Sequence, residues 1–257
     1  MLTLREIRRV ENHDAILGDE SKRKEVSDWL DRGDIVVARQ VVPKDRLLAI
    51  RAYLTRVGQN TLPAYSPIVQ GAPNFHRIND WDERSYVKGC FHQFSFLPWN
   101  QDYFRAFELL RPVYAMRNLL AGLCPDAFLA REPYQGCVAR LSFQFYPSGQ
   151  GALNRHVDPY DFHQRVVPII LMSKKGVDFH EGGAYVETSS GERVILDDGA
   201  DIGDVIYFNS QMAHGVAPID PGSGAHWLDF RGRWIMLAAV NRLAGNTAVG
   251  DAKDLEA

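Results

Sequence analysis

Three residues of the chain, two of them histidines, could together hold a divalent metal ion. His156 and Asp158 lie two positions apart in LNRHVDPYD, after a strand-like run, and residues i and i+2 of an extended chain point to the same side. His214 lies in QMAHGVAP, just after the strand-like run DVIYFN. Two neutral imidazoles and one carboxylate leave adjacent positions open, which is the ligand set expected for non-haem Fe(II) that binds a co-substrate and O₂ together. Zinc more often takes a closed site or a single bound water.

Two arginines precede the last apolar run, FRGRWIMLAAVN, and either could bind a carboxylate. The planar guanidinium of Arg231 or Arg233 can pair with a carboxylate through two parallel hydrogen bonds. Both have the same strand parity, so alternation does not choose between them. We favour Arg233 because it directly abuts the apolar run. Arg242 has the opposite parity and would lie about 30 Å further along an extended strand.

Length and composition point to a soluble globular protein with a small-molecule partner. The 257 residues can form one large domain or two small ones, and the formal net charge of -3 comes from interspersed signs. No basic run suggests nucleic acid or a membrane surface as partner, and no apolar segment predicts secretion or a membrane span. Cys90, Cys124 and Cys137 lack any CxxC pair, so we expect a reducing cytoplasm. The oligomeric state is left open.

The pattern of the chain predicts an α+β, mainly β protein with its helices first. Residues 1–135 read as helical with single strands, and Pro112 is expected to kink or divide one helix. Residues 59–88 are rich in Pro, Gly and Asn, which is typical of a lid or binding loop, although a plain surface excursion is equally compatible. Short strands with turn residues between them fill residues 136–243, which predicts an antiparallel sandwich or barrel, and 244–257 forms a C-terminal tail. No linker separates these parts, so we expect one domain over 1–257.

From about Cys137 to Asn241 the sequence resembles the double-stranded β-helix (jelly roll, cupin-like) core of the Fe(II)/2-oxoglutarate-dependent dioxygenases. The motifs that carry the resemblance are HVD, EGGAYVE, IGDVIYFNSQMAHGV and RGRWIML. The N-terminal stretch DRGDIVVARQVVPKDRLLAIRAYL is similar to the opening of the phytanoyl-CoA-hydroxylase-like and amino-acid-hydroxylase branches. Arg233 follows His214 at a longer interval than is usual in the family, and DPGSGAHWLDF between them looks like an inserted turn.

The resemblance implies a metal site and a co-substrate site. His156, Asp158 and His214 would hold Fe(II), and Arg233, or else Arg231, would bind the remote carboxylate of 2-oxoglutarate. The co-substrate would chelate the iron, O₂ would take the remaining position, and succinate and CO₂ would be released. Family members that halogenate carry Gly or Ala in place of the carboxylate, so Asp158 favours hydroxylation, with desaturation or ring formation also open.

Alternation in ARLSFQFYP, which leads into the HVD motif, predicts the lining of the cavity. One face consists of Leu141, Phe143 and Phe145, and the other of Arg140, Ser142, Gln144 and Tyr146. We predict that the polar face lines the cavity, with Tyr146 or Gln144 holding 2-oxoglutarate and Arg140 reaching substrate or co-substrate. The alternative is that this face meets solvent.

Other polar residues near the motifs are weaker candidates. Arg77 and Trp81 lie in the irregular region and could contact substrate, although ordinary loop polarity explains them equally well. His163 and His226 lie near the motifs in sequence, but their neighbours do not match the family pattern, so we expect surface or supporting roles for both.

The sequence thus favours hydroxylation of an unactivated C–H bond in a small polar metabolite, such as a free amino acid, in biosynthesis. A second reading is an oxygenase that acts on a carrier-bound or protein-bound substrate. A third is a cupin-like metal-dependent isomerase or a non-catalytic ligand-binding module, for which the arginine before the last strand has no use.

Overall fold

The computed structural model describes residues 1–224 and 227–256, in which β-strands predominate. Residues 225–226, in the segment expected to be an inserted turn, lie outside this range, and so does the predicted supporting role of His226. None of the described helices is long and apolar enough to cross a membrane. The helices are α1 (His13–Leu17), α2 (Glu20–Asp31), α3 (Lys44–Asn60) and α4 (Ala106–Leu120), with a short 3₁₀ helix at Tyr103–Arg105. The strands are β1 (Ile7–Val10), β2 (Ile35–Ala38), β3 (Phe75–Asp80), β4 (Gly89–Phe96), β5 (Cys137–Pro147), β6 (Ala152–Val157), β7 (Val166–Leu171), β8 (Gly183–Glu187), β9 (Arg193–Ile195), β10 (Val205–Asn209), β11 (His214–Ala217), β12 (Gly232–Arg242) and β13 (Lys253–Asp254).

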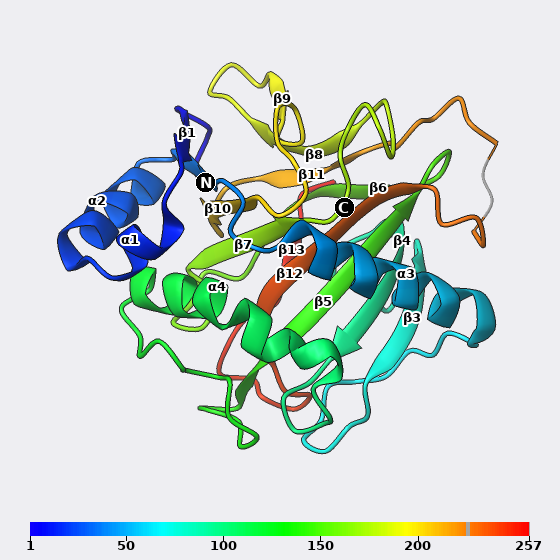
Figure 1. Ribbon diagram of the computed structural model, residues 1–257, viewed down its shortest axis with the longest axis horizontal. Coiled ribbons are helices and arrows are strands. Elements are labelled where there is room, and N and C mark those ends of the chain that lie inside the picture. Colours follow the sequence, from blue (N-terminus) through cyan, green and yellow to red (C-terminus); the bar gives the residue numbers. More distant parts are fainter. Residues whose placement is uncertain (225–226, 257) are drawn as a thin grey trace.

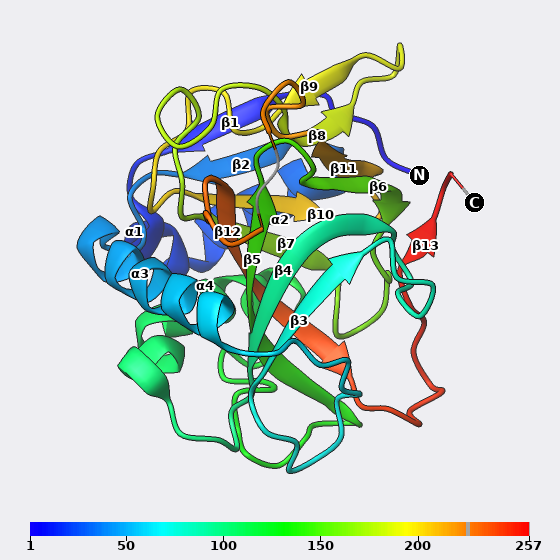
Figure 2. The ribbon, with the colours of Figure 1, turned by 90° about the vertical axis from the view of Figure 1, so that its right-hand side faces the viewer.

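The strands β5 to β12 form a double-stranded β-helix. In spatial order, β10, β7, β12 and β5 make a larger antiparallel sheet, and β6, β11, β8 and β9 make a smaller one. The chain passes repeatedly from one sheet to the other, which is the jelly-roll arrangement. The larger sheet is extended by β2 and β1 beyond β10, and by β4 and β3 beyond β5 (Figures 1 and 2). The predicted fold class is therefore confirmed.

Strand alternation divides the apolar side chains of the larger sheet between two cores. One face of β5, with Phe143 and Phe145, packs against residues of the helices such as Leu110 and Val113. The opposite face of the sheet contributes to a second core, between the two sheets. Figure 2 shows α3 and α4 together on one side of the larger sheet, away from β8 and β11. The cavity described below is therefore bounded by the sheets and not by the helices.

Three local expectations differ from the structure. A strand, β3, occupies part of the segment 59–88 that was expected to be irregular, and it is held by pairing with β4. The segment 244–257 is not only a tail, since β13 pairs with β6. Of the two outcomes expected at Pro112, a kink or a division, the structure excludes the division, since α4 continues through Pro112, where Leu110, Val113 and Tyr114 are fully buried.

Truncation of Phe143 tests the outer core. The side chain is fully buried and contacts Phe96 edge-on at 5.4 Å between ring centroids. We expect Phe143→Ala to lower the free energy of unfolding by about 3–5 kcal/mol, measured by urea denaturation, because a large cavity remains. Leu62 is 94% exposed, so Leu62→Ala should change the stability by less than about 0.5 kcal/mol. Similar losses in both variants would contradict this assignment of the core.

Candidate metal site and cavity

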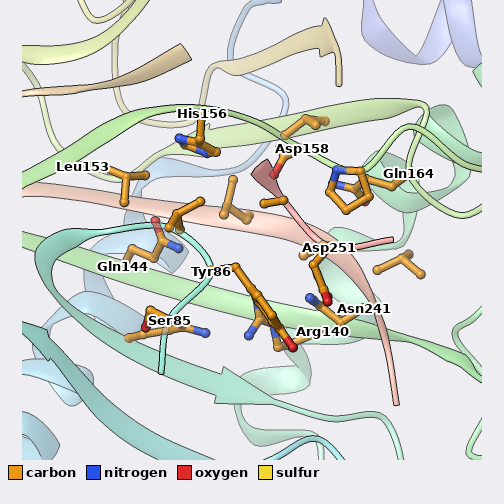
Figure 3. Close-up of a pocket in the computed structure, with 18 of the residues that line it drawn as sticks. Ser85, Tyr86, Arg140, Gln144, Leu153, His156, Asp158, Gln164, Asn241 and Asp251 are labelled. Carbon is orange, nitrogen blue, oxygen red and sulfur yellow. The ribbon is translucent and has the colours of Figure 1, made fainter. Parts of the chain in front are cut away.

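The pairing of β6 with β11 brings the two predicted histidine ligands together. His156 and His214 are direct partners in this antiparallel pair, and their ring centroids are 4.2 Å apart. Asp158 follows the end of β6, and its Oδ2 lies 3.6 Å from Nε2 of His214. One ligand atom from each of the three residues lies within 4.8 Å of the others. Figure 3 shows His156 and Asp158 at the same cavity.

Backbone carbonyls orient both imidazoles for metal binding. Nδ1 of His156 donates to the carbonyl of Asn154, and Nδ1 of His214 donates to that of Met212, each at 2.9 Å. A carbonyl oxygen can only accept, so each ring carries a proton on Nδ1, and Nε2 is the nitrogen that can bind a metal. Burial, and then the neighbouring His214, lower the pKa of His156 to about 4, which keeps its ring neutral at physiological pH. Two imidazoles and one partly exposed carboxylate form a donor set that fits a divalent ion such as Fe(II).

The pairing of β5 with β12 forms the floor of a cavity of about 340 Å³ beside these ligands. Opposed residues of an antiparallel pair share a face, and Arg233 lies opposite Tyr146. Further along the same face, Ile235 lies opposite Gln144, and Ala239 lies opposite Arg140. All of these residues line the cavity, so the polar face of β5 points into it as the alternation predicted.

Arg233 is fully buried at one end of the cavity with unused hydrogen-bonding capacity. Its Nε donates to Oδ1 of Asp197 at 2.8 Å, while Nη1 and Nη2 have no partner among the described residues. Leaving buried donors unpaired is costly, so these two nitrogens indicate a site for an acceptor. Arg231, in contrast, is exposed outside the cavity wall and pairs with Asp229. The structure therefore distinguishes the two arginines, which strand parity could not do: Arg233 lines the cavity and Arg231 does not.

Tyr146 and Gln144 form a polar pair next to Arg233. The Tyr146 hydroxyl donates to Oε1 of Gln144 at 2.7 Å, and the Arg233 guanidinium lies over the tyrosine ring at 5.6 Å. Burial raises the pKa of Tyr146, although the Arg233 charge opposes this, so the hydroxyl stays protonated. Both side chains line the cavity, as the sequence analysis expected.

Asp197 supports Arg233 and was missed by the sequence analysis. Its Oδ2 accepts a hydrogen bond from the Ala184 amide at 2.7 Å, which fixes the carboxylate that holds the guanidinium. A Cβ at Gly183, whose φ is +122°, would lie 2.7 Å from the same oxygen, and one at Gly182 would lie 2.1 Å from the Pro218 carbonyl. The Gly-Gly entry to β8 therefore makes room for this contact. The hairpin of β8 and β9 could have revealed it, because continuing its register by two residues beyond Tyr185 and Ile195 brings Asp197 to Gly183.

Of the remaining candidate residues, some line the cavity and one does not. Arg77 and Arg140 line the cavity, as expected for substrate contacts. Trp81 is about half exposed and is not part of the wall. His163 is buried in the wall, with no partner for its Nδ1 among the described residues, so it is not a surface residue.

Comparison with solved structures shows the fold. A prolyl-4-hydroxylase from Pseudomonas putida superposes with a TM-score of 0.52 and 17% identity, covering 86% of this chain and 98% of that one. The non-haem α-ketoglutarate-dependent epimerase SnoN from nogalamycin biosynthesis superposes with a TM-score of 0.52 and 11% identity, covering 87% and 84%. No protein-family model and no curated protein matches the sequence. The chain has the fold of the non-haem 2-oxoglutarate-dependent oxygenases, which confirms the resemblance at the level of the fold.

Removal of one imidazole tests the metal site. We expect His156→Ala to lose tight binding of one equivalent of Mn(II), used as a redox-stable probe and measured by calorimetry without oxygen, because only two ligands remain. His180→Ala is the matched control, since His180 is exposed and lies outside the cluster. Equal Mn(II) affinity in both variants would refute the site.

Proposed function

We propose that the protein is an Fe(II)- and 2-oxoglutarate-dependent oxygenase that hydroxylates an unactivated C–H bond of a small polar metabolite, such as a free amino acid. The observation that carries the proposal is the presence in one cavity of the His156, Asp158 and His214 cluster and of the buried Arg233, two of whose guanidinium nitrogens have no partner within residues 1–224 and 227–256. The fold similarity agrees with it.

Each residue would have a defined part in binding. The two imidazoles and the Asp158 carboxylate would hold the iron, while Arg233 would bind the remote carboxylate of 2-oxoglutarate with Tyr146 beside it. When bound, iron and 2-oxoglutarate would together activate O₂ for oxidation of a C–H bond, with release of succinate and CO₂. Asp197 would keep the guanidinium in place before the co-substrate arrives, which lowers the ordering cost of binding.

The apolar floor between the ends of the cavity would position the substrate carbon. Ile235, Leu237 and Ala239 face the cavity along β12. These side chains offer no hydrogen bonds, so they exclude water and favour a C–H group over a polar one. Residues of the segment 59–88, among them Tyr65 and Tyr86, also line the cavity, and we propose that this segment covers its mouth.

Arg233 also helps to choose between the alternative functions. A cupin-like isomerase or a simple binding module has no need of a buried guanidinium aimed at a metal-bound dicarboxylate, whereas a 2-oxoglutarate-dependent enzyme does. The oxygenase hypothesis is therefore favoured. The assay below tests whether the substrate is free or bound to a carrier.

The deciding assay measures succinate. Purified protein with Fe(II), ascorbate and 2-oxoglutarate should form succinate when a pool of small metabolites is added, and none when 2-oxoglutarate or iron is left out. A pool of carrier-tethered candidates is tested in parallel. Succinate only with the tethered pool would transfer the proposal to carrier-bound substrates, and absence of 2-oxoglutarate binding to the metal-loaded protein would refute it.

Exchange of Arg233 tests the co-substrate site. We expect Arg233→Gln to raise the Kd for 2-oxoglutarate by at least about 30-fold, measured by anaerobic calorimetry with Mn(II), because the remote carboxylate loses a buried charged partner. Arg233→Lys keeps the charge but not the planar fork, so its Kd should be intermediate. Arg231→Gln is the control and should bind as the wild type does, because Arg231 is exposed. Weakened binding in Arg231→Gln alone would reverse the assignment.

A further inference from the structure

Two arginines of the cavity have no carboxylate partner among the described residues. The Arg140 guanidinium, on β5, makes no ion pair, and its buried Nε has no hydrogen-bond partner. Arg77, on β3, donates from Nη2 to the neutral Oε1 of Gln93 at 2.8 Å and lies over the ring of Tyr65 at 5.0 Å, while its Nε is also unpaired. Neither guanidinium therefore forms an ion pair with a described carboxylate, although Asp82 attracts Arg77 and Asp158 attracts Arg140 from further away.

The acidic groups of the cavity are already engaged elsewhere. Asp251 pairs with Arg242 at 2.5 Å, and Asp158 belongs to the metal cluster. Burial, and then the charge of Arg77, lower the pKa of Arg140 to about 10, so Arg140 remains charged at neutral pH. Two neighbouring cations in a partly buried wall are unfavourable unless an anion binds between them.

Arg140 lies at the end of the cavity opposite to Arg233. Arg77 begins nearer the middle, opposite Gln93, which pairs with Gln144, and its charge acts on Arg140. Arg233 pairs with Tyr146 and Ala239 pairs with Arg140, so six residues of strand, or about 20 Å, separate the two ends. The apolar side chains of Ile235 and Leu237 lie between them. A 2-oxoglutarate carboxylate bound at Arg233 would therefore not occupy the Arg140 end of the cavity, which remains accessible to a second molecule.

A further unpaired polar atom lies near Arg140. Oδ1 of Asn241, two residues beyond the Ala239 that faces Arg140, is buried in the same wall and has no partner in the described part of the chain. In Figure 3 the side chains of Arg140, Tyr86, Asn241 and Asp251 group together, apart from Gln144 and Leu153. A ligand at this end would meet two cationic donors and an amide acceptor.

We infer that Arg77 and Arg140 bind a carboxylate of the primary substrate, which is therefore an organic acid. Its oxidised carbon would lie over the apolar floor between the two arginine ends, and a donor next to the carboxylate, such as an amino or hydroxyl group, would reach Asn241. The inference adds the substrate class to the proposed function. It rests on that function in one respect, that the bound acid is the substrate that is oxidised.

The test uses acetate as the carboxylate probe, acetamide as its neutral counterpart and inorganic phosphate as the competing anion. The protein is loaded with Mn(II) and 2-oxoglutarate without oxygen, and the midpoint temperature of unfolding is measured at constant ionic strength. At about ten times its Kd, acetate should raise the midpoint by about 3 °C, and acetamide should not. Arg140→Met should abolish the acetate effect while changing the Kd for 2-oxoglutarate less than about two-fold. Arg56→Met, on the exposed face of α3, should keep the effect.

Each contrary result is decisive. Equal shifts with acetate and acetamide, an acetate shift that persists in Arg140→Met, or stabilisation by phosphate alone would overturn the inference. A much weaker 2-oxoglutarate affinity in Arg140→Met would place this arginine in the co-substrate site instead. An Arg140-dependent acetate shift without any 2-oxoglutarate binding would keep the acid site and reject the oxygenase. Without ligands, Arg140→Met should unfold at or above the wild-type temperature, because an unpaired charge is removed, and a large decrease would mark Arg140 as structural.

Discussion

The antiparallel pairing of β6 and β11 is the constraint on which the site depends. It sets His156 directly opposite His214, and the strand period sends both rings to the same side. A slip of the register by one residue would turn one imidazole away from the other. Both rings are further fixed by backbone carbonyls only two residues away, so the positions of the ligands follow from local main-chain geometry.

The cavity concentrates buried positive charge, which folding alone does not favour. Among the described residues, Arg233 has Asp197 as its carboxylate partner and two nitrogens without a partner, while Arg140 has no ion pair. Such groups lower stability in the free protein and gain their partners from ligands. The outer core of aromatic and aliphatic side chains on the far face of the same strands supplies the stability that this arrangement needs.

The sequence predicted the parts of the protein that strand periodicity and ligand chemistry determine. His156 with Asp158 and the two faces of β5 could be inferred because each depends on residue type and a spacing of two, whereas His214 was added from its residue type, its place after a strand and the family resemblance. Asp197 escaped because its role arises from a cross-strand contact with β8. The short strands β3 and β13 escaped because they consist largely of polar residues and are held by pairing with β4 and β6. The continuity of α4 through Pro112 depends on burial that no local pattern shows.

The pairing of β13 has a consequence for how the chain can be extended or labelled. Asp254 lies opposite His156 in the β6–β13 pair, and at the other end of the chain Leu2 forms a bridge with Met212, whose carbonyl orients His214. Figure 2 shows the N-terminus and β13 on the same side of the molecule. An affinity tag or fusion partner attached at either end would thus begin close to a main-chain segment that positions His156 or His214. It could therefore change metal binding, even though the tag is far from both histidines in the sequence.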